Sequence, residues 1–217
     1  MPPPRGFGAP SAILQVTESL AFMLFNTVVS SFGSISIAAV GLVLRVSDFA
    51  FMPILGVSHG LLPIVGFCFG AQLFKRLWRA VKLASAGITA LLVVITVILE
   101  IFTPQIIGVF AKDAELISVA VPALRIMMST MVFVGLNIML ITAFQGLSRG
   151  KTALVLSLIR QFIVFVPLIY LFRFLFGLTG VWWSGPASDT IGFIVSLAFI
   201  FREYRLQQRA GSQPMKY

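Results

Sequence analysis

Charged residues are scarce in this chain of 217 residues. Asp, Glu, Lys and Arg make up 11% of it, whereas a soluble domain carries about 25%. Hydrophobic residues make up 59%, and the mean hydropathy is +1.02. This composition excludes an ordinary soluble domain and predicts an integral membrane protein. There is also a single cysteine, Cys68, which excludes an intrachain disulfide and is interpreted as a small buried apolar residue.

Catalytic and metal-binding motifs are absent from the sequence. It contains no CxxC, GxGxxG, GxxxxGK[ST] or HExxH pattern. Its one histidine, His59, lies in a membrane span between Ser58 and Gly60, with no plausible catalytic nucleophile placed beside it, and one histidine cannot build a His-rich metal site. We therefore expect neither an enzyme nor a cofactor or metal site. The net charge of +9 is interpreted as basic membrane loops rather than as a nucleic-acid-binding surface.

Apolar stretches long enough to cross a bilayer occur six times, on the rule of about 20 helical residues per span. The expected spans are residues 11–32, 35–70, 81–102, 116–147, 153–176 and 181–201. We expect the third span to end before Pro104, a helix-breaking residue. The predicted fold is therefore all-α. It comprises an N-terminal cytoplasmic segment (1–10), a lobe of six transmembrane helices (11–203) and a polar cytoplasmic tail (204–217), in which the stretch QQRAGSQPMKY is expected to be disordered.

Basic residues mark alternate loops between these spans. They follow the second, fourth and sixth spans, at Lys75, Arg76, Arg79, Lys82, Arg149, Lys151, Arg202, Arg205, Arg209 and Lys216. Because loops rich in Lys and Arg stay on the cytoplasmic side, we expect both termini in the cytoplasm. The turns near Gly33 and residues 177–180 are then external. This predicts a multi-pass protein of the cell (inner or plasma) membrane.

The second span is longer than a simple membrane anchor and is interrupted. Its sequence is ISIAAVGLVLRVSDFAFMPILGVSHGLLPIVGFCFG. Proline removes a helical hydrogen bond, and glycine lets backbones approach closely. We interpret Pro53, Gly56 and Pro63 as a hinge in a moving helix that lines a polar cavity.

Ionisable residues at membrane depth are costly, so each is a functional hypothesis. Arg45 and Asp48 are three residues apart on one helical face, while Arg160 and Asp189 lie in the last two spans. Structural ion pairing and a role in ion coupling both stay open for these four residues. Glu18 and Arg160 both lie about 10 Å deep at 1.5 Å per residue, so they would pair if the first and fifth spans are neighbours.

Glu18 shares a helical face with Gln15, Phe22 and Asn26, at spacings of three or four. A carboxylate among amides and aromatic rings is typical of a cation or proton site beside a pocket for an organic cation. The alternative is that this face packs on a neighbouring helix. The fourth span adds Asn137 and flexible thioethers, which suit either a binding surface or core packing, at Met127, Met128, Met131 and Met139.

Several segments, taken together and in order, resemble a known family. They are GAPSAILQVTESLAF, FGSISIAAVGLVLRVSDFAFMPILGVSHGLLPIVGFCFGA, FAKDAELISVAVPALRI, FQGLSRGKTALVLSLIRQ and GVWWSGPASD. They resemble the C-terminal half of a MATE (multidrug and toxic compound extrusion) transporter. The resemblance implies a twelve-helix antiporter of two six-helix lobes, which exports cationic or amphipathic drugs in exchange for sodium ions or protons.

The resemblance also bears on individual positions. The family's glutamate in its seventh helix falls on Glu18, which implies a role in binding the substrate or the coupling ion. Some sodium-coupled relatives carry an aspartate in the tenth helix, where this chain has GLNIMLITAFQG, with Asn137 and no carboxylate. The family's proton-site aspartate in the first helix would belong to the other lobe.

The expected function is secondary active efflux of cationic or amphipathic drugs, coupled to proton or sodium antiport, with this chain as one lobe that is inactive alone. Its expected partners are the lipid bilayer, a small organic cation and a second six-helix lobe, either an N-terminal half or a second copy. Two alternatives stay open: a flippase for lipid-linked precursors from the same superfamily, and a degenerate, non-transporting half. An intramembrane enzyme is disfavoured because Glu18, Asp48 and His59 are too dispersed to form one site.

Overall fold

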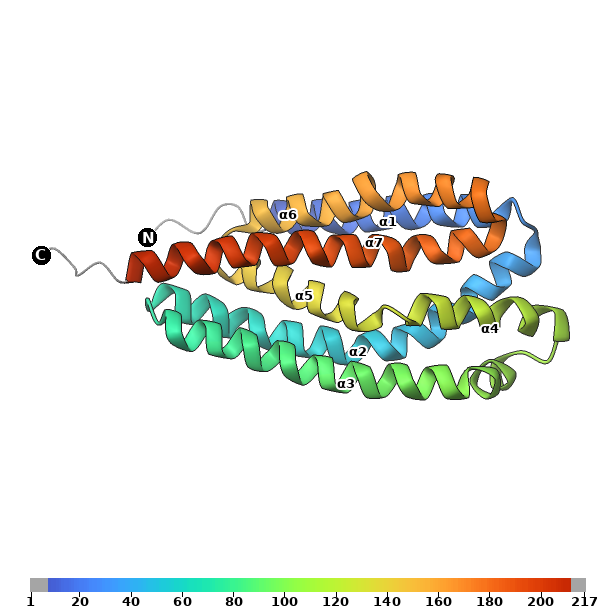
Figure 1. Cartoon of the computed structure of the whole chain (residues 1–217), viewed down its shortest axis with the longest axis horizontal. Coiled ribbons are helices and arrows are strands. Elements are labelled where there is room, and N and C mark those ends of the chain that lie inside the picture. The colour runs from blue at the N-terminus through green and yellow to red at the C-terminus, as the bar shows by residue number, and fades with distance from the viewer. Residues whose placement is uncertain (1–7, 212–217) are drawn as a thin grey trace, which may run out of the picture.

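The computed structural model describes the backbone of residues 8–211 and the side chains of residues 16–205. The described part is built from helices (Figure 1). In chain order they are α1 (Gly8–Ser30), α2 (Ser34–Gly70), α3 (Phe74–Phe110), α4 (Ala114–Met128), α5 (Met131–Gly146), α6 (Gly150–Leu158), the π-helix η1 (Ile159–Phe165) and α7 (Val166–Gly211).

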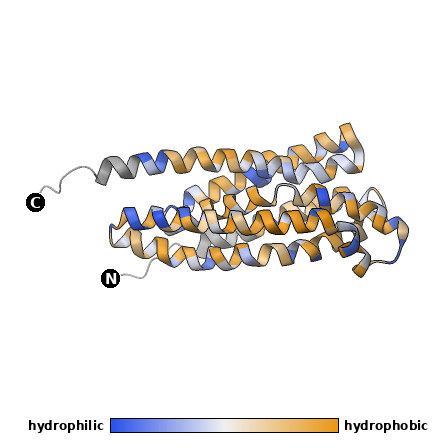
Figure 2. Cartoon of the chain, turned by 60° about the horizontal axis from the view of Figure 1, so that its bottom comes forward, coloured by the Kyte–Doolittle hydropathy of each residue, from blue (hydrophilic) through white to orange (hydrophobic). Residues whose placement is uncertain are grey.

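The helices lie side by side along one long axis and reverse direction at the two ends of the bundle (Figure 1). The turns after α2 and α5 lie at the same end as the two ends of the described chain. The turns after α1 and α3 lie at the opposite end, with the reversal inside α7. Hydrophilic residues gather at the ends, whereas the lengths between them are mainly hydrophobic (Figure 2). This is the alternation predicted from the basic loops, while the cytoplasmic orientation itself stays a prediction.

Six passes account for this architecture. Among the described residues, α2, α3 and the stretch Gly150–Arg205 are each long and apolar enough to cross a membrane, and α4 with α5 forms a fourth span bent by 45°. The stretch Gly150–Arg205 reverses at Gly177, whose φ of 61° is a left-handed conformation that glycine adopts readily, so it makes two passes. With α1, this gives the predicted six-helix lobe.

The helix α3 corrects the prediction that its span ends before Pro104. It continues through Pro104 to Phe110. Pro104 offers no N–H to the carbonyl of Glu100, while the Thr103 hydroxyl donates to the carbonyl of Leu99 and lies 3.4 Å from that of Glu100. Side-chain compensation of this kind lets proline persist inside a membrane helix.

The stretch QQRAGSQPMKY, predicted to be disordered, begins inside α7, which runs to Gly211, while residues 212–217 lie outside the described residues. Just before this stretch, α7 is held against other helices. Tyr204 packs edge-to-face on Trp78 of α3 at 5.1 Å between ring centroids, and the Lys82 ammonium lies 5.6 Å from the Tyr204 ring. The buried carboxylate of Glu203 accepts from Arg149 at 3.1 Å. These contacts extend the helix beyond the apolar stretch seen in the sequence.

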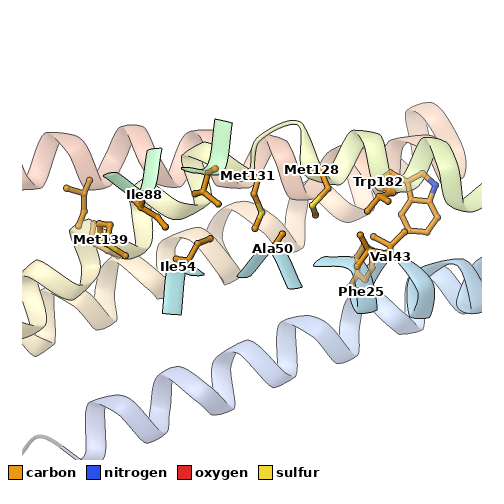
Figure 3. Close-up of a cluster of buried hydrophobic side chains, with 14 of the residues drawn as sticks. Phe25, Val43, Ala50, Ile54, Ile88, Met128, Met131, Met139 and Trp182 are labelled. Carbon is orange, nitrogen blue, oxygen red and sulfur yellow. The ribbon is translucent and has the colours of Figure 1, made fainter. Parts of the chain in front are cut away.

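The core runs along the bundle between α2, α3, α5 and α7 (Figure 3). Ile54, Ile88 and Met139 are fully enclosed there, and Phe25 and Trp182 lie together at one end of the cluster. Cys68 is 6% exposed, which confirms its interpretation as a buried apolar residue. The core therefore fixes α1 and α7 beside each other at the end where Phe25 and Trp182 meet.

Candidate functional site

A cavity of about 230 Å³ opens beside this end of the core. It lies between α1, α2, α4, η1 and α7. Its lining combines aromatic rings with three ionisable groups: Glu18, Ala21, Phe22, Phe25, Leu44, Met127, Arg160, Gln161, Phe165, Trp182, Gly185, Ser188 and Asp189. Residues far apart in the sequence thus form one partly polar site at membrane depth.

The π-helix η1 supplies Arg160, Gln161 and Phe165 to this cavity. In an α-helix of 3.6 residues per turn, positions 160 and 165 would lie about 140° apart around the axis. A π-helix bonds residue i to i+5, so the same two positions lie close to one full turn apart and face the same side. The unusual winding therefore brings a cation and an aromatic ring to one wall.

Arg160 forms an ion pair with Asp189 of α7. Its Nη1 donates to Asp189 Oδ1 at 2.6 Å, and both side chains are largely buried. The sequence offered Glu18 as a possible partner of Arg160, and this pairing is wrong, because α7 lies against η1 and presents Asp189 to it. Glu18 lines the same cavity but is exposed at its edge.

Two buried polar atoms of η1 have no hydrogen-bond partner in the described part of the chain. They are Nε of Arg160 and Oε1 of Gln161. One is a donor and the other an acceptor, and both residues line the cavity. A buried donor or acceptor without a hydrogen-bond partner costs free energy. The site can therefore form hydrogen bonds beyond the ion pair with Asp189.

Aromatic rings form the apolar side of the cavity, centred on Phe25. Its ring lies 6.5 Å from Phe22, 6.0 Å from Phe165 and 6.1 Å from Trp182, centroid to centroid. Sequence reasoning placed Phe22 here but missed Phe165, Trp182 and the neighbouring Gln161. Only the packing of η1 and α7 on α1 brings these residues together, and no local pattern in the sequence carries that information.

Other predicted binding residues lie elsewhere. Asn137 is 2% exposed inside the bundle, where its Oδ1 accepts from the Ser196 hydroxyl at 2.7 Å. Asn26 is half-buried and does not line the cavity. The side chain of Gln15 lies outside the described residues. Of the four methionines, Met128, Met131 and Met139 fill the core, and only Met127 reaches the cavity.

Arg45 and Asp48 do not form the ion pair that their spacing allowed. Both side chains are exposed on α2, and in the stretch that the structure covers neither takes part in an ion pair. Pro53 and Pro63, with Gly56 between them, lie inside α2, which continues unbroken past them. Their role as a hinge stays a prediction.

No group of metal-ligating side chains gathers among the described residues. The cavity instead offers carboxylates, one guanidinium and aromatic faces. Carboxylates and ring faces attract organic cations, while exposed charge at membrane depth marks a substrate or ion pathway. This chemistry is that of binding, with no nucleophile and base held together for a reaction.

Comparison with known proteins agrees with this geometry. A family model described as MatE matches residues 10–171. The multidrug export protein MepA of Staphylococcus saprophyticus subsp. saprophyticus is 24% identical over 194 residues, which cover 89% of this chain and 43% of the relative. The chain thus spans less than half the length of the curated relatives it matches.

Solved structures share the fold. Inward-facing and outward-facing conformations of a multidrug resistance MATE family transporter of the MOP superfamily give TM-scores of 0.86 and 0.87, at 22% and 23% sequence identity. Each match covers 93% of this chain and 47% and 46% of the transporter, respectively. The likeness is therefore to half of each solved chain.

Proposed function

This chain belongs to the MatE family of transporters, which are not enzymes, and we propose that it is one lobe of a multidrug efflux transporter in the cell membrane. The lobe binds a cationic or amphipathic drug and exchanges it for a proton or a sodium ion, with Glu18 as the coupling carboxylate. A second six-helix lobe, either an N-terminal half or another copy, completes the cavity. The matched relatives, which are about twice as long as this chain, support this proposal.

The observation that carries the proposal is charge exposed at membrane depth. Arg45 and Asp48 lie about 16 and 21 Å along α2 from Ser34, at 1.5 Å per residue, and both are exposed. Glu18 of α1 is exposed as well. Charged side chains in a membrane face a protein interior or a water-filled cavity rather than lipid. The face of α1 and α2 therefore requires a polar surface opposite it, which this chain does not supply among its described residues.

The charge of the cavity favours an organic cation over a lipid pyrophosphate. Two carboxylates, Glu18 and Asp189, outweigh one guanidinium, Arg160. A pyrophosphate would meet net repulsion, whereas a cation finds a carboxylate beside the aromatic faces of Phe22 and Phe25. The flippase alternative is therefore not favoured by any observation on this lobe.

Transport by rocking of two lobes needs each lobe to move as one body around a central site. The fold matches half of an inward-facing and half of an outward-facing transporter almost equally well, which supports such a motion. Pro53, Gly56 and Pro63 give α2 a place to bend as the cavity opens and closes. Proline inside a helix removes a backbone bond, so bending there costs less than elsewhere.

Ethidium efflux from cells that lack their own pumps tests the proposal. The unchanged chain is expressed alone and together with a candidate first lobe, and the Glu18→Gln variant is expressed in the same two ways. Glu115→Gln is the matched control, since it makes the same change in the exposed first turn of α4. We expect efflux only with the partner lobe, lost in Glu18→Gln and kept in Glu115→Gln. Efflux that survives Glu18→Gln would contradict the coupling role, and folded, inserted protein without efflux in any combination would indicate a non-transporting half.

A further inference from the structure

Helix α7 is shaped to hold the side chain of Arg160. A Cβ atom at Gly192 would lie 2.8 Å from both Cγ and Cδ of Arg160, so only a glycine leaves room for the aliphatic stem. Three residues earlier, on the same face of α7, Asp189 accepts from the guanidinium at 2.6 Å. Helix α7 therefore contacts both the aliphatic part of the Arg160 side chain and its guanidinium group. This is a more specific arrangement than a contact between two charges alone.

The ionisable groups that line the cavity among the described residues are Glu18, Arg160 and Asp189. Arg160 neutralises Asp189, so the net charge of the cavity is one negative charge, carried by Glu18. The Nε of Arg160 has no partner among the residues that the structure describes, so the guanidinium keeps donor capacity for a second acceptor on the same cavity wall.

We propose that Arg160 is a tethered cation that sets the charge selectivity of the cavity. It occupies Asp189, leaves Glu18 as the single attractive charge, and thereby makes the lobe select a monovalent cation over a dication. This inference rests on the proposed function, in which the ligand is an organic cation. It assigns Arg160 as a specificity-determining residue, positioned by Gly192 and Asp189.

A distinctive consequence concerns Asp189. Its removal by Asp189→Asn frees Arg160, whose guanidinium then neutralises Glu18 across the cavity. Cation binding is weakened although Glu18 is unchanged. Removing both charges, with Arg160→Gln and Asp189→Asn together, leaves Glu18 uncompensated again and restores binding. If the ion pair were purely structural, the double variant would bind the cation no more tightly than Asp189→Asn does.

The test is fluorescence titration of the purified, full-length chain in detergent with ethidium and propidium, which share a ring system but carry one and two positive charges. We expect the unchanged chain to prefer ethidium, and Arg160→Gln to shift the affinity ratio toward propidium on the order of tenfold. Arg160→Lys keeps the charge and the ratio. Asp189→Asn weakens both dyes about tenfold, and the double variant returns to the original ratio.

An unchanged ratio in Arg160→Gln, or full binding in Asp189→Asn, would overturn the inference. If either single variant fails to fold, the double variant decides the test, because its cavity carries the same net charge as that of the unchanged chain. An altered ratio of ethidium to propidium affinity in the double variant, or no dye binding, would count against the proposal. Failure of the proposed function looks different, since the unchanged chain and Glu18→Gln would then bind ethidium equally or not at all.

Discussion

Asn137 shows how a residue can match a binding-site position and still serve the core. Its amide lies between α5 and α7, bonded to Ser196 at 2.7 Å and 2% exposed. We expect Asn137→Ala to lower stability by about 1 kcal/mol, because the Ser196 hydroxyl loses its partner inside the bundle. Ethidium affinity should not change, since Asn137 does not line the cavity. Thermal unfolding and dye titration of the purified chain measure both.

The control for this residue is Ser196→Ala, which removes the other half of the bond. Each single variant should cost a similar amount, and the double variant should cost less than their sum, because the same bond is lost once. A drop in ethidium affinity with unchanged unfolding temperature would instead place Asn137 in the binding site.

At the scale of helices, α5 lies close against α2 at Gly146. A Cβ atom there would lie 2.6 Å from Cγ1 of Val65 and 3.3 Å from the backbone nitrogen of Gly66. We expect Gly146→Ala to destabilise the lobe by about 1–3 kcal/mol, since α2 and α5 would have to separate. Unfolding of the purified variant by heat measures the change.

The matched variant is Gly87→Ala on α3, where an added Cβ meets no atom within 4 Å. There the same substitution should be neutral or stabilising by up to about 1 kcal/mol, because alanine favours the helix more than glycine does. Equal losses at Gly146 and Gly87 would show that helix propensity, not the contact of α5 with α2, decides the effect.

The number and order of the helices could be predicted from the sequence, because a membrane span needs a long apolar stretch whatever its packing. Their interruptions could not. Pro104 was expected to end α3, yet Thr103 and the surrounding bundle let the helix continue. The π-helix at Ile159–Phe165 is followed by Pro167, which offers no N–H to the carbonyl of Ile163, but the sequence alone did not indicate that the chain would rewind there and stay helical.

Individual residues of the candidate site could be predicted from the sequence, but their contacts with one another could not. Glu18, Phe22, Arg160 and Asp189 were identified because charge and aromatic rings at membrane depth need a reason. The pairing of Arg160 with Asp189 was not identified, because it depends on α7 lying against η1 and on the space at Gly192. Periodicity is masked where nearly every face is apolar, so the sequence does not show which helices are neighbours.

At the scale of the whole lobe, two kinds of exposed surface must be told apart. On α3, exposed side chains are apolar along its middle, for example Leu91, Val94 and Ile98, at 42%, 55% and 48% exposure. On α2, the exposed side chains include Arg45 and Asp48 among apolar ones such as Phe49, at 66% exposure. Both faces lie at membrane depth, yet lipid satisfies only the first. The proposed two-lobe arrangement therefore assigns the α3 side to lipid and the charged side of α2 to a polar cavity.

Cysteine labelling separates these two faces, since a maleimide reacts with the thiolate, which forms in water and not in hydrocarbon. In a Cys68→Ala background, Asp48→Cys and Val94→Cys place single thiols about 21 and 24 Å from the same end of the bundle, at 1.5 Å per residue from Ser34 and Phe110. With a second lobe present, we expect a water-soluble maleimide to label Asp48→Cys in membranes at least tenfold faster than Val94→Cys. Without the second lobe only the first reaction should slow, because lipid then replaces the water of the cavity. Equal, slow labelling at both positions would mean that lipid covers α2, and the two-lobe arrangement would then lose its main support.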